Sequence, residues 1–148
     1  MNSIWILVAN QAEAQIYSSK QFTGNLTLLH TLTNAEASAH TRELTTDAPG
    51  RVHDRTGPAR HSIEPETGIK EEGRRRFVKE MVDLLEAARQ KGDFKQLVVL
   101  AAPAVLGVIR KSLTDSLSRI IAKEIPKDVI GQDKEKIQTQ LKRAFELK

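Results

Sequence analysis

Apolar and polar positions in the first third of the chain follow the patterns of β-strands. Residues 4–8 form a continuous apolar run rich in β-branched and aromatic side chains, which predicts a strand buried on both faces. Residues 12–18 alternate between apolar and polar side chains, which predicts a half-buried strand. A third strand is predicted over residues 26–32. The short turns at Asn10 and Gly24 make the three strands a β-meander.

The rest of the chain alternates between helical and strand patterns. Apolar residues recur at helical spacing over residues 70–91, which predicts an amphipathic helix with Thr67 as a candidate N-cap and Gly92 at its C-terminal end. After it we predict a strand over 97–102, a helix over 103–113 that begins with Pro103, a strand over 119–125, and a helix that Asp133 caps and that ends near residue 147.

The element order predicts one α/β domain over residues 1–148. The order is β-β-β, a loop, then α-β-α-β-α, and such alternation is typical of a partly parallel sheet covered by helices. We therefore expect a mixed sheet of about five strands. Strand 4–8 should pair with strand 12–18 and lie near strand 97–102 in the same sheet.

Residues 34–69 have no sustained helical or strand period. They hold three of the four histidines, several arginines, and turn signals at Pro49-Gly50, Gly57-Pro58 and Glu64-Pro65. Loops longer than about 12–15 residues in a compact domain are usually functional or disordered. Function is therefore sought in this segment, which we take as a long basic and polar loop and expect to be largely mobile.

Composition excludes some classes of protein. The chain has 148 residues, 39% hydrophobic and 28% charged, which is ordinary for a single soluble domain. Its longest N-terminal apolar run is far shorter than the roughly 20 residues of a membrane span and follows no signal-peptide pattern, so a cytoplasmic location is expected. Zero cysteines exclude disulfides and thiolate chemistry. The net charge of +4 permits an anionic partner.

Enzyme chemistry has weak support in the sequence. A nuclease of the ribonuclease-H type needs carboxylates on the first strand to hold metal ions, and residues 4–8 contain none. Asp47, His53, Asp54 and His61 are a candidate metal or acid–base set, but the loop does not fix their spacing, and solvated loop histidines are the ordinary alternative. No cofactor and no metal are expected, and the interpretation leans away from an enzyme.

Cations beside the loop are candidates for phosphate binding. Arg74, Arg75, Arg76 and Lys79 lie near the start of the predicted long helix, and cations beside a loop can bind phosphates independently of sequence. Acidic residues lie among them, so a solvated helix face is the alternative explanation. The full set of candidate nucleic-acid contacts is Arg42, Arg51, Arg55, Arg60, His61, Arg74 and Arg75.

Several motifs occur in the order typical of one bacterial family. They are WILVA at residues 5–9, AEAQIY at 12–17, DAPGR at 47–51, LVVLAAP at 97–103 with Leu106, Gly107 and Arg110, and Lys127-Asp128. On these motifs the chain resembles the bacterial host attachment protein family over essentially its whole length. That family is similar to the middle domain of the archaeo-eukaryotic peptide chain release factors. The resemblance implies a ribonuclease-H-like α/β fold of the kind seen in translation machinery.

The hydrolytic motif of the release factors does not carry over to this chain. In those proteins the loop before the long helix contains Gly-Gly-Gln, whereas the nearest piece here is GPARH at residues 57–61. No glutamine lies between Gln21 and Gln90, and Pro58 replaces the second glycine, which removes a backbone N–H donor. Peptide release by that mechanism is therefore not expected.

Two functions of different classes stay open. The first is an RNA- or ribosome-associated module that uses the long loop for contact. The second is a protein-interaction factor that contributes indirectly to attachment of bacteria to host cells, as the family's name implies. The sequence does not identify the partner or the oligomeric state.

Overall fold

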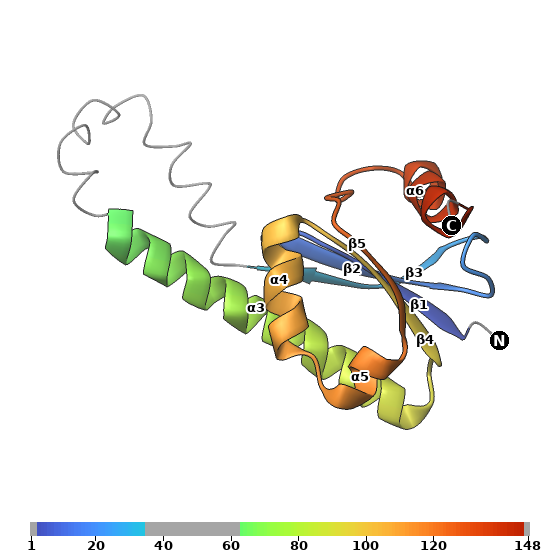
Figure 1. Cartoon of the computed structure of the whole chain (residues 1–148), viewed down its shortest axis with the longest axis horizontal. Coiled ribbons are helices and arrows are strands. Elements are labelled where there is room, and N and C mark those ends of the chain that lie inside the picture. The colour runs from blue at the N-terminus through green and yellow to red at the C-terminus, as the bar shows by residue number, and fades with distance from the viewer. Residues whose placement is uncertain (1–2, 35–62, 147–148) are drawn as a thin grey trace.

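The fold is built on one mixed sheet of five strands. The computed structural model describes residues 3–34 and 63–146. The sheet has the order β3-β2-β1-β4-β5 (Figure 1). Its strands are β1 (Ile4–Ala9), β2 (Glu13–Ser19), β3 (Thr27–Thr33), β4 (Gln96–Ala101) and β5 (Ile121–Ile125). The helices are α3 (Ile63–Lys91), α4 (Pro103–Ser112), α5 (Asp115–Arg119) and α6 (Lys134–Glu146).

Strand pairing places β1 at the centre of the sheet. β1 pairs antiparallel with β2, where Leu7 lies opposite Ile16, and parallel with β4, where Leu7 lies opposite Val99. β2 pairs antiparallel with β3, and β4 pairs parallel with β5. Both expected neighbours of the first strand are confirmed. The mixed α/β sheet with a three-strand meander followed by two parallel strands confirms the predicted ribonuclease-H-like fold class.

Helices cover both faces of the sheet. α3, α4 and α5 lie on one face, where Trp5, Leu7 and Ile16 of the sheet meet Phe77 and Met81 of α3 (Figure 1). Trp5 is a core residue as expected, and its ring stacks on Phe94 with centroids 4.7 Å apart. We call this the α3 face. α6 lies on the opposite face, the α6 face, where Ile137 and Leu141 pack on the other side of β1 and β4.

Three predicted helix ends are confirmed. Gly92 has φ of +81°, its N–H donates to the carbonyl of Arg89, and the next N–H, of Asp93, donates to Ala88, which is the C-terminal arrangement that favours glycine. Pro103 occupies the first turn of α4. The side chain of Asp133 accepts from the N–H of Lys136 and so caps α6.

Two boundaries predicted from the sequence are wrong. α3 begins at Ile63, so Thr67 lies inside the helix and is not its cap. The sequence presents Pro65 as part of a turn signal, but a proline is compatible with the first turn of a helix, where no intrahelical N–H bond is lost. The predicted break near residue 114 contains α5, because the Thr114 side chain accepts from Leu117 N–H and starts a helical turn. β5 therefore begins at Ile121.

Two further predictions concern a membrane span and the mobility of the long loop. In the described part of the chain, no helix is long and apolar enough to cross a membrane. The expected mobility of the loop concerns residues that are almost entirely outside the described ranges, and it stays a prediction.

Candidate functional site

The carboxyl ends of β1 and β4 meet at a topological switch point. From β1 the chain turns to β2 and β3 on one side, while β4 and β5 lie on the other side. In open α/β sheets, ligands bind in the crevice outside the carboxyl ends of the strands at such a point. The groups at this edge are therefore the first place to look for a site, and we call it the carboxyl edge.

Asn10 organises the backbone at this edge. Its side-chain oxygen accepts from the N–H groups of Ala12 (2.8 Å) and Glu13 (2.9 Å), which holds the tight turn between β1 and β2. Its side-chain NH₂ donates to both carboxylate oxygens of Asp128, at 3.3 and 3.2 Å. Asp128 in turn accepts from the N–H of Ile130. One carboxamide thus joins the first turn of the chain to the segment between β5 and α6.

Arg74 of α3 reaches the same edge. Its guanidinium donates to the side-chain oxygen of Gln11, the residue after Asn10, at 3.4 Å. Asn34, at the end of β3, donates from its side chain to the carbonyl of Gln11 (3.0 Å) and from its N–H to Ala12 (2.9 Å). Arg74 is half-buried, and its Nε has no hydrogen-bond partner among the described residues. A cation therefore lies beside the point where residues 35–62 join the sheet.

The N-terminus of α4 adds positive potential to this edge. Ala102, which precedes the helix, donates to the carbonyl of Ala9 at the end of β1. No side chain caps α4, and its first turn contains no acidic residue. The first N–H groups of a helix have no intrahelical acceptors and carry partial positive charge. Together with Arg74 they are the groups at the carboxyl edge that can contact an anionic group, at an edge that also holds the carboxylate of Asp128.

Glu13 brings one negative charge to the start of β2. Its carboxylate accepts from the side chain of Gln15 (3.2 Å), whose oxygen accepts from the hydroxyl of Tyr17 (2.9 Å). Burial and, secondarily, the charge of Glu13 raise the pKa of Tyr17 above its ordinary value. The phenol therefore acts here as a neutral donor that orients Gln15.

The structure tests only part of the predicted site. Arg74 is half-buried at the carboxyl edge, and Arg75 is exposed on the neighbouring surface of α3. The remaining predicted contacts lie outside the described residues: Arg42, Arg51, Arg55, Arg60 and His61. The candidate acid–base set of Asp47, His53, Asp54 and His61 lies outside them as well. Within the described ranges, no cluster of His, Asp and Glu side chains is arranged to hold a metal ion.

The prediction that the loop is basic is wrong. Residues 34–69 contain four arginines, no lysine and six acidic residues, which gives a formal net charge of −2 with neutral histidines. The arginines of the loop therefore act as individual contacts at most. The positive potential must come from groups outside the loop, such as Arg74, Arg75 and the α4 N-terminus.

Sequence reasoning missed Asn10, Gln11 and Asp128 as parts of one site. Asn10 and Gln11 were interpreted only as a turn, and Asp128 only as part of a motif. The available signal was the position of polar residues directly after two predicted strands. Their meeting depends on how the segment after β5 packs against the turn between β1 and β2, which no local pattern specifies.

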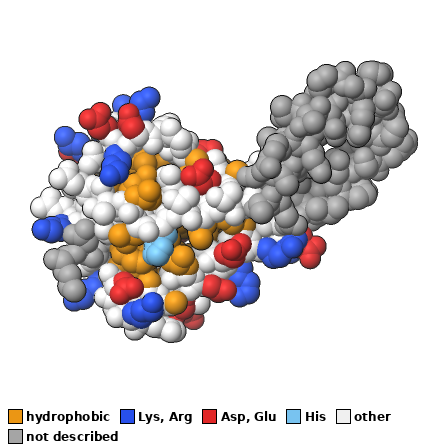
Figure 2. Space-filling view, turned by 180° about the vertical axis from the view of Figure 1, so that it is seen from behind, with side chains coloured by type: hydrophobic (Ala, Val, Ile, Leu, Met, Phe, Trp, Pro, Cys, Tyr) orange, Lys and Arg blue, Asp and Glu red, His pale blue; other side chains and the backbone are white. Residues whose placement is uncertain are grey.

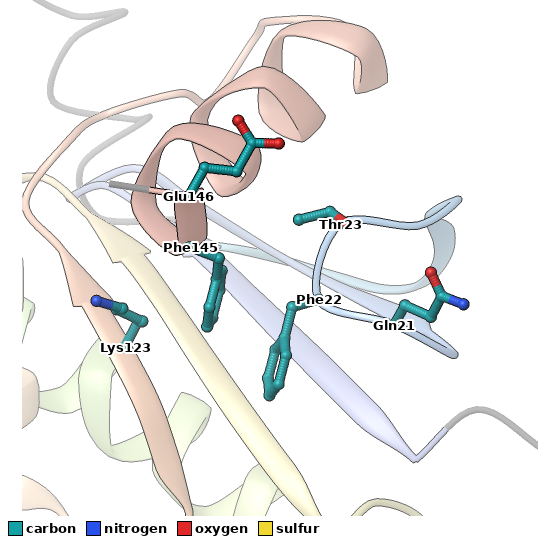
Figure 3. A pocket seen from close by; sticks show the side chains of 6 residues that line it. All are labelled: Gln21, Phe22, Thr23, Lys123, Phe145 and Glu146. Atoms are coloured by element: carbon teal, nitrogen blue, oxygen red, sulfur yellow. The ribbon is translucent and has the colours of Figure 1, made fainter. Parts of the chain in front are cut away.

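A second surface feature lies away from the carboxyl edge. A groove of ≈ 730 Å³ is lined by the turn between β2 and β3, by β5 and by the end of α6, through Gln21, Phe22, Thr23, Lys123, Phe145 and Glu146 (Figure 3). Phe22 and Phe145 stack with centroids 4.4 Å apart, and the Lys123 ammonium lies 5.8 Å from the Phe145 ring. The groove contains none of the predicted contacts.

Comparison with known proteins identifies relatives. Residues 5–141 match the sequence profile of the family described as "Protein required for attachment to host cells". An uncharacterized protein of Rickettsia prowazekii (strain Madrid E) is 32% identical over 70 residues, which is 46% of this chain and 47% of that protein. The chain therefore aligns with about half the length of this curated relative.

Two solved structures are similar to the fold. The archaeal translation termination factor aRF1 superposes with a TM-score of 0.47 at 18% identity, over 95% of this chain and 37% of that chain. A structure described as "Archaeal protein" superposes with a TM-score of 0.45 at 16% identity, over 95% of this chain and 36% of that chain.

Proposed function

This chain belongs to the family described as proteins required for attachment to host cells, and we propose that it is an RNA- or ribosome-associated module that binds phosphate at its carboxyl edge. The family predicted from the sequence is thereby confirmed. The molecular activity and the partner are the proposal, and the arguments for them come from the geometry of the edge.

The observation that carries the proposal is the position of Arg74. Its guanidinium lies against Gln11 at the switch point of the sheet. The α4 N-terminus, which has no acid in its first turn, lies at the ends of the same two strands. Guanidinium groups and free backbone N–H groups are donors that suit phosphate oxygens. A polyphosphate backbone matches this set of donors better than a neutral ligand.

Arg75 extends the same surface. Arg75 follows Arg74 on α3 and is exposed. Arg42, Arg51, Arg55, Arg60 and His61 belong to the segment that follows Asn34 in the sequence, outside the described residues, and stay proposed contacts. Because that segment is not net basic, we assign the main electrostatic contribution to α3 and α4.

Salt dependence of RNA binding tests the proposal. The double variant Arg74→Gln with Arg75→Gln should flatten the slope of log affinity against log salt by about 1.4–1.8, because each lost phosphate contact changes it by roughly 0.7–0.9. The charge-matched control is Lys111→Gln with Arg119→Gln, which removes two exposed charges where α4 ends and in α5. Structured RNA is the probe, and thermal unfolding checks that each variant is folded.

The salt dependence of the two double variants distinguishes RNA binding at a local site from binding that depends on net charge alone. Equal loss of slope in both double variants would mean that net charge alone drives binding, and no local site exists. Absence of RNA or ribosome association at low salt, measured by co-sedimentation of the intact protein with ribosomes, would overturn the proposal.

The alternative is a protein-interaction factor that contributes indirectly to host attachment. The family's description and the exposed leucines of β3, Leu28 and Leu29, favour it. Capture of partners from a lysate with and without nuclease treatment distinguishes the two functions. Partners that survive nuclease treatment favour the alternative, and partners that disappear favour the RNA-associated function.

A further inference from the structure

The two edges of the sheet differ in how they are protected. β5 forms one edge and carries Lys123 and Glu124, which discourage pairing with another strand. β3 forms the other edge and contains no charged residue and no proline over its seven residues. Its leucines Leu28 and Leu29 are 43% and 41% exposed. An uncharged, exposed apolar edge strand is a template for pairing with another chain.

Hydrophobic side chains gather around this edge on the surface. Figure 2 shows them around a single histidine, and His30 is the one histidine within the described ranges. The His30 ring lies 5.8 Å from the Trp5 ring on the α3 face of the sheet. Leu32 of β3 is partly buried and packs against the core on the same face.

The hydrogen-bond phase of β3 shows which of its backbone groups point away from β2. Residues of an antiparallel strand direct their N–H and C=O groups alternately toward one neighbour and away from it. The N–H of Asn34 donates to the carbonyl of Ala12, which precedes β2. Because the direction alternates along the strand, the N–H and C=O groups of Thr33 and Thr31 point away from β2. No strand in the described part of the chain pairs with β3 on that side.

Because of a β-bulge, the backbone groups of Leu28 also point away from β2. Tyr17 of β2 pairs with Leu28 and the adjacent Ile16 pairs with His30, so Leu29 is the extra residue. The bulge resets the alternation, and Leu28 directs its groups outward like Thr31 and Thr33. Thr31 pairs with Gln15 of β2, while Leu28 pairs with Tyr17 and Thr33 pairs with Glu13. Leu28 and Thr33 therefore lie at equal distances from Thr31 along the sheet, on opposite sides of it. The outward-facing groups are therefore symmetric about Thr31.

We propose that β3 pairs antiparallel with β3 of a second copy of this chain, with the two-fold axis at Thr31. In this register Thr31 exchanges two hydrogen bonds with Thr31 of the second copy, and Leu28 exchanges two with Thr33 at each end. Every outward-facing residue thus meets an outward-facing residue. The two sheets join into one continuous sheet of ten strands, with an isologous interface.

Side chains are compatible with this register. Residues directly opposite in an antiparallel pair share a face of the sheet. His30 lies opposite Leu32 of the second copy, and both are on the α3 face because they pair with Ile16 and Ala14 of β2. Thr31 lies opposite Thr31, and Leu28 lies opposite Thr33, all on the α6 face. The register therefore matches apolar or uncharged side chains on both faces.

The absence of charge in β3 favours a second copy as the partner. A strand that meets its own copy meets its own charges, and like charges directly opposite destabilise a pair. β3 has none, whereas self-pairing of β5 would bring lysine and glutamate side chains to the interface. Strand-edge contacts alone form a small interface, so we expect a concentration-dependent equilibrium between monomer and dimer.

Cysteine cross-linking tests the register. The chain has no native cysteine, so Thr31→Cys introduces a single thiol. Opposite residues in a hydrogen-bonded pair have Cα atoms about 5.5 Å apart, within the range of disulfides. Mild oxidation should therefore convert Thr31→Cys into a covalent dimer. Thr33→Cys, which lies opposite Leu28 in this register, should form no covalent dimer, and equal cross-linking of both variants would overturn the register.

Charge placement tests the dimer without oxidation. Thr31→Lys puts two ammonium groups opposite each other at the axis and should abolish dimer formation in sedimentation analysis up to about 1 mM protein, a range that detects weak association. The matched control, Ala122→Lys, adds the same charge to the exposed edge of β5 and should leave dimerisation unchanged. A wild-type chain that stays monomeric throughout this range, or an equal effect of both lysines, would overturn the proposal.

Discussion

Single side chains join segments of this protein that are far apart in sequence. Asn10 holds its own turn and also binds Asp128, which is 118 residues away. Glu86 of α3 accepts from Arg89 through two bonds, at 3.1 and 2.7 Å, and from the hydroxyl of Thr114 at 3.1 Å. Because Thr114 also caps α5, Glu86 ties the long helix to the start of α5.

At the residue scale, Glu86 predicts a specific acid sensitivity. Hydrogen bonds from Arg89, and then from Thr114 and Gln90, lower the pKa of Glu86 from 4.5 to about 2. A carboxylate with a lowered folded-state pKa stabilises the fold above its unfolded pKa and loses this effect as pH falls through the folded value. The stability advantage of wild type over Glu86→Gln should therefore be full above pH 4.5 and shrink toward pH 2.

Urea unfolding across this pH range measures the effect. The control is Glu80→Gln, which removes an exposed carboxylate from the same helix. A difference between wild type and Glu86→Gln that stays constant from pH 5 to about pH 2, the window set by linkage, would contradict the assignment. A Glu80→Gln variant with the same pH dependence would show that the effect is not specific to Glu86.

At the element scale, α6 is the one described helix that packs on its face of the sheet. It covers the α6 face of the sheet, while α3, α4 and α5 pack on the opposite face. Ile137 and Leu141 are one helical turn apart, and both are fully buried against that face. The carboxamide of Gln138 also donates to the carbonyl of Gly24, which fixes α6 to the turn between β2 and β3.

The replacement Leu141→Ala should destabilise the protein by about 2–5 kcal/mol, because it removes buried apolar atoms and leaves a cavity. The neighbouring exposed residue supplies the control: Lys142→Ala should change stability by less than about 0.5 kcal/mol. Chemical denaturation measures both values. A loss below about 1 kcal/mol for Leu141→Ala would mean that α6 contributes little to the core, against the usual cost of such cavities.

At the scale of the whole molecule, the protection of backbone amides against hydrogen exchange is expected to fall from the centre of the sheet to the β3 edge. β1 is buried along its whole length and hydrogen-bonded on both sides, whereas β3 is exposed and paired on one side. Amide groups open with free energies that follow burial and pairing. The molecule is thus stable around β1 and β4 and accessible at β3.

Hydrogen exchange in dilute protein should show this gradient residue by residue. The amides of β1 and β4 should exchange slowest, and within the sheet the outward-facing amides of Leu28, Thr31 and Thr33 should exchange fastest. Raising the protein concentration should slow these three in particular, if β3 pairs with a second copy. Outward amides as protected as those of β1 at high dilution would show that the β3 edge is covered within the monomer.

Much of the architecture follows from local patterns in the chain. Every strand and the core of every long helix in residues 3–34 and 63–146 were predicted, because burial imposes a period of 2 or 3.6 on neighbouring residues. Gly92, Pro103 and Asp133 were predicted at helix ends because capping depends on groups within four residues. The errors at Ile63 and Thr114 concern short-range signals with two meanings: a proline suits both a turn and the first helical turn, and a threonine can end one element or cap the next.

The sequence by itself determined the elements, their order and the apolar faces that form the core, since these depend on neighbouring residues. The neighbours of β1 in the sheet were predicted as well. Only the tertiary structure decided how the helices and connecting segments pack around the sheet, and so which polar groups share the carboxyl edge. The contacts of Asn10 with Asp128 and of Glu86 with Thr114 arise from that arrangement. The bulge at Leu29 belongs to the same class, because it is defined by pairing with β2. Long-range pairing is chosen by the free energy of the whole packed sheet, and no local pattern encodes it.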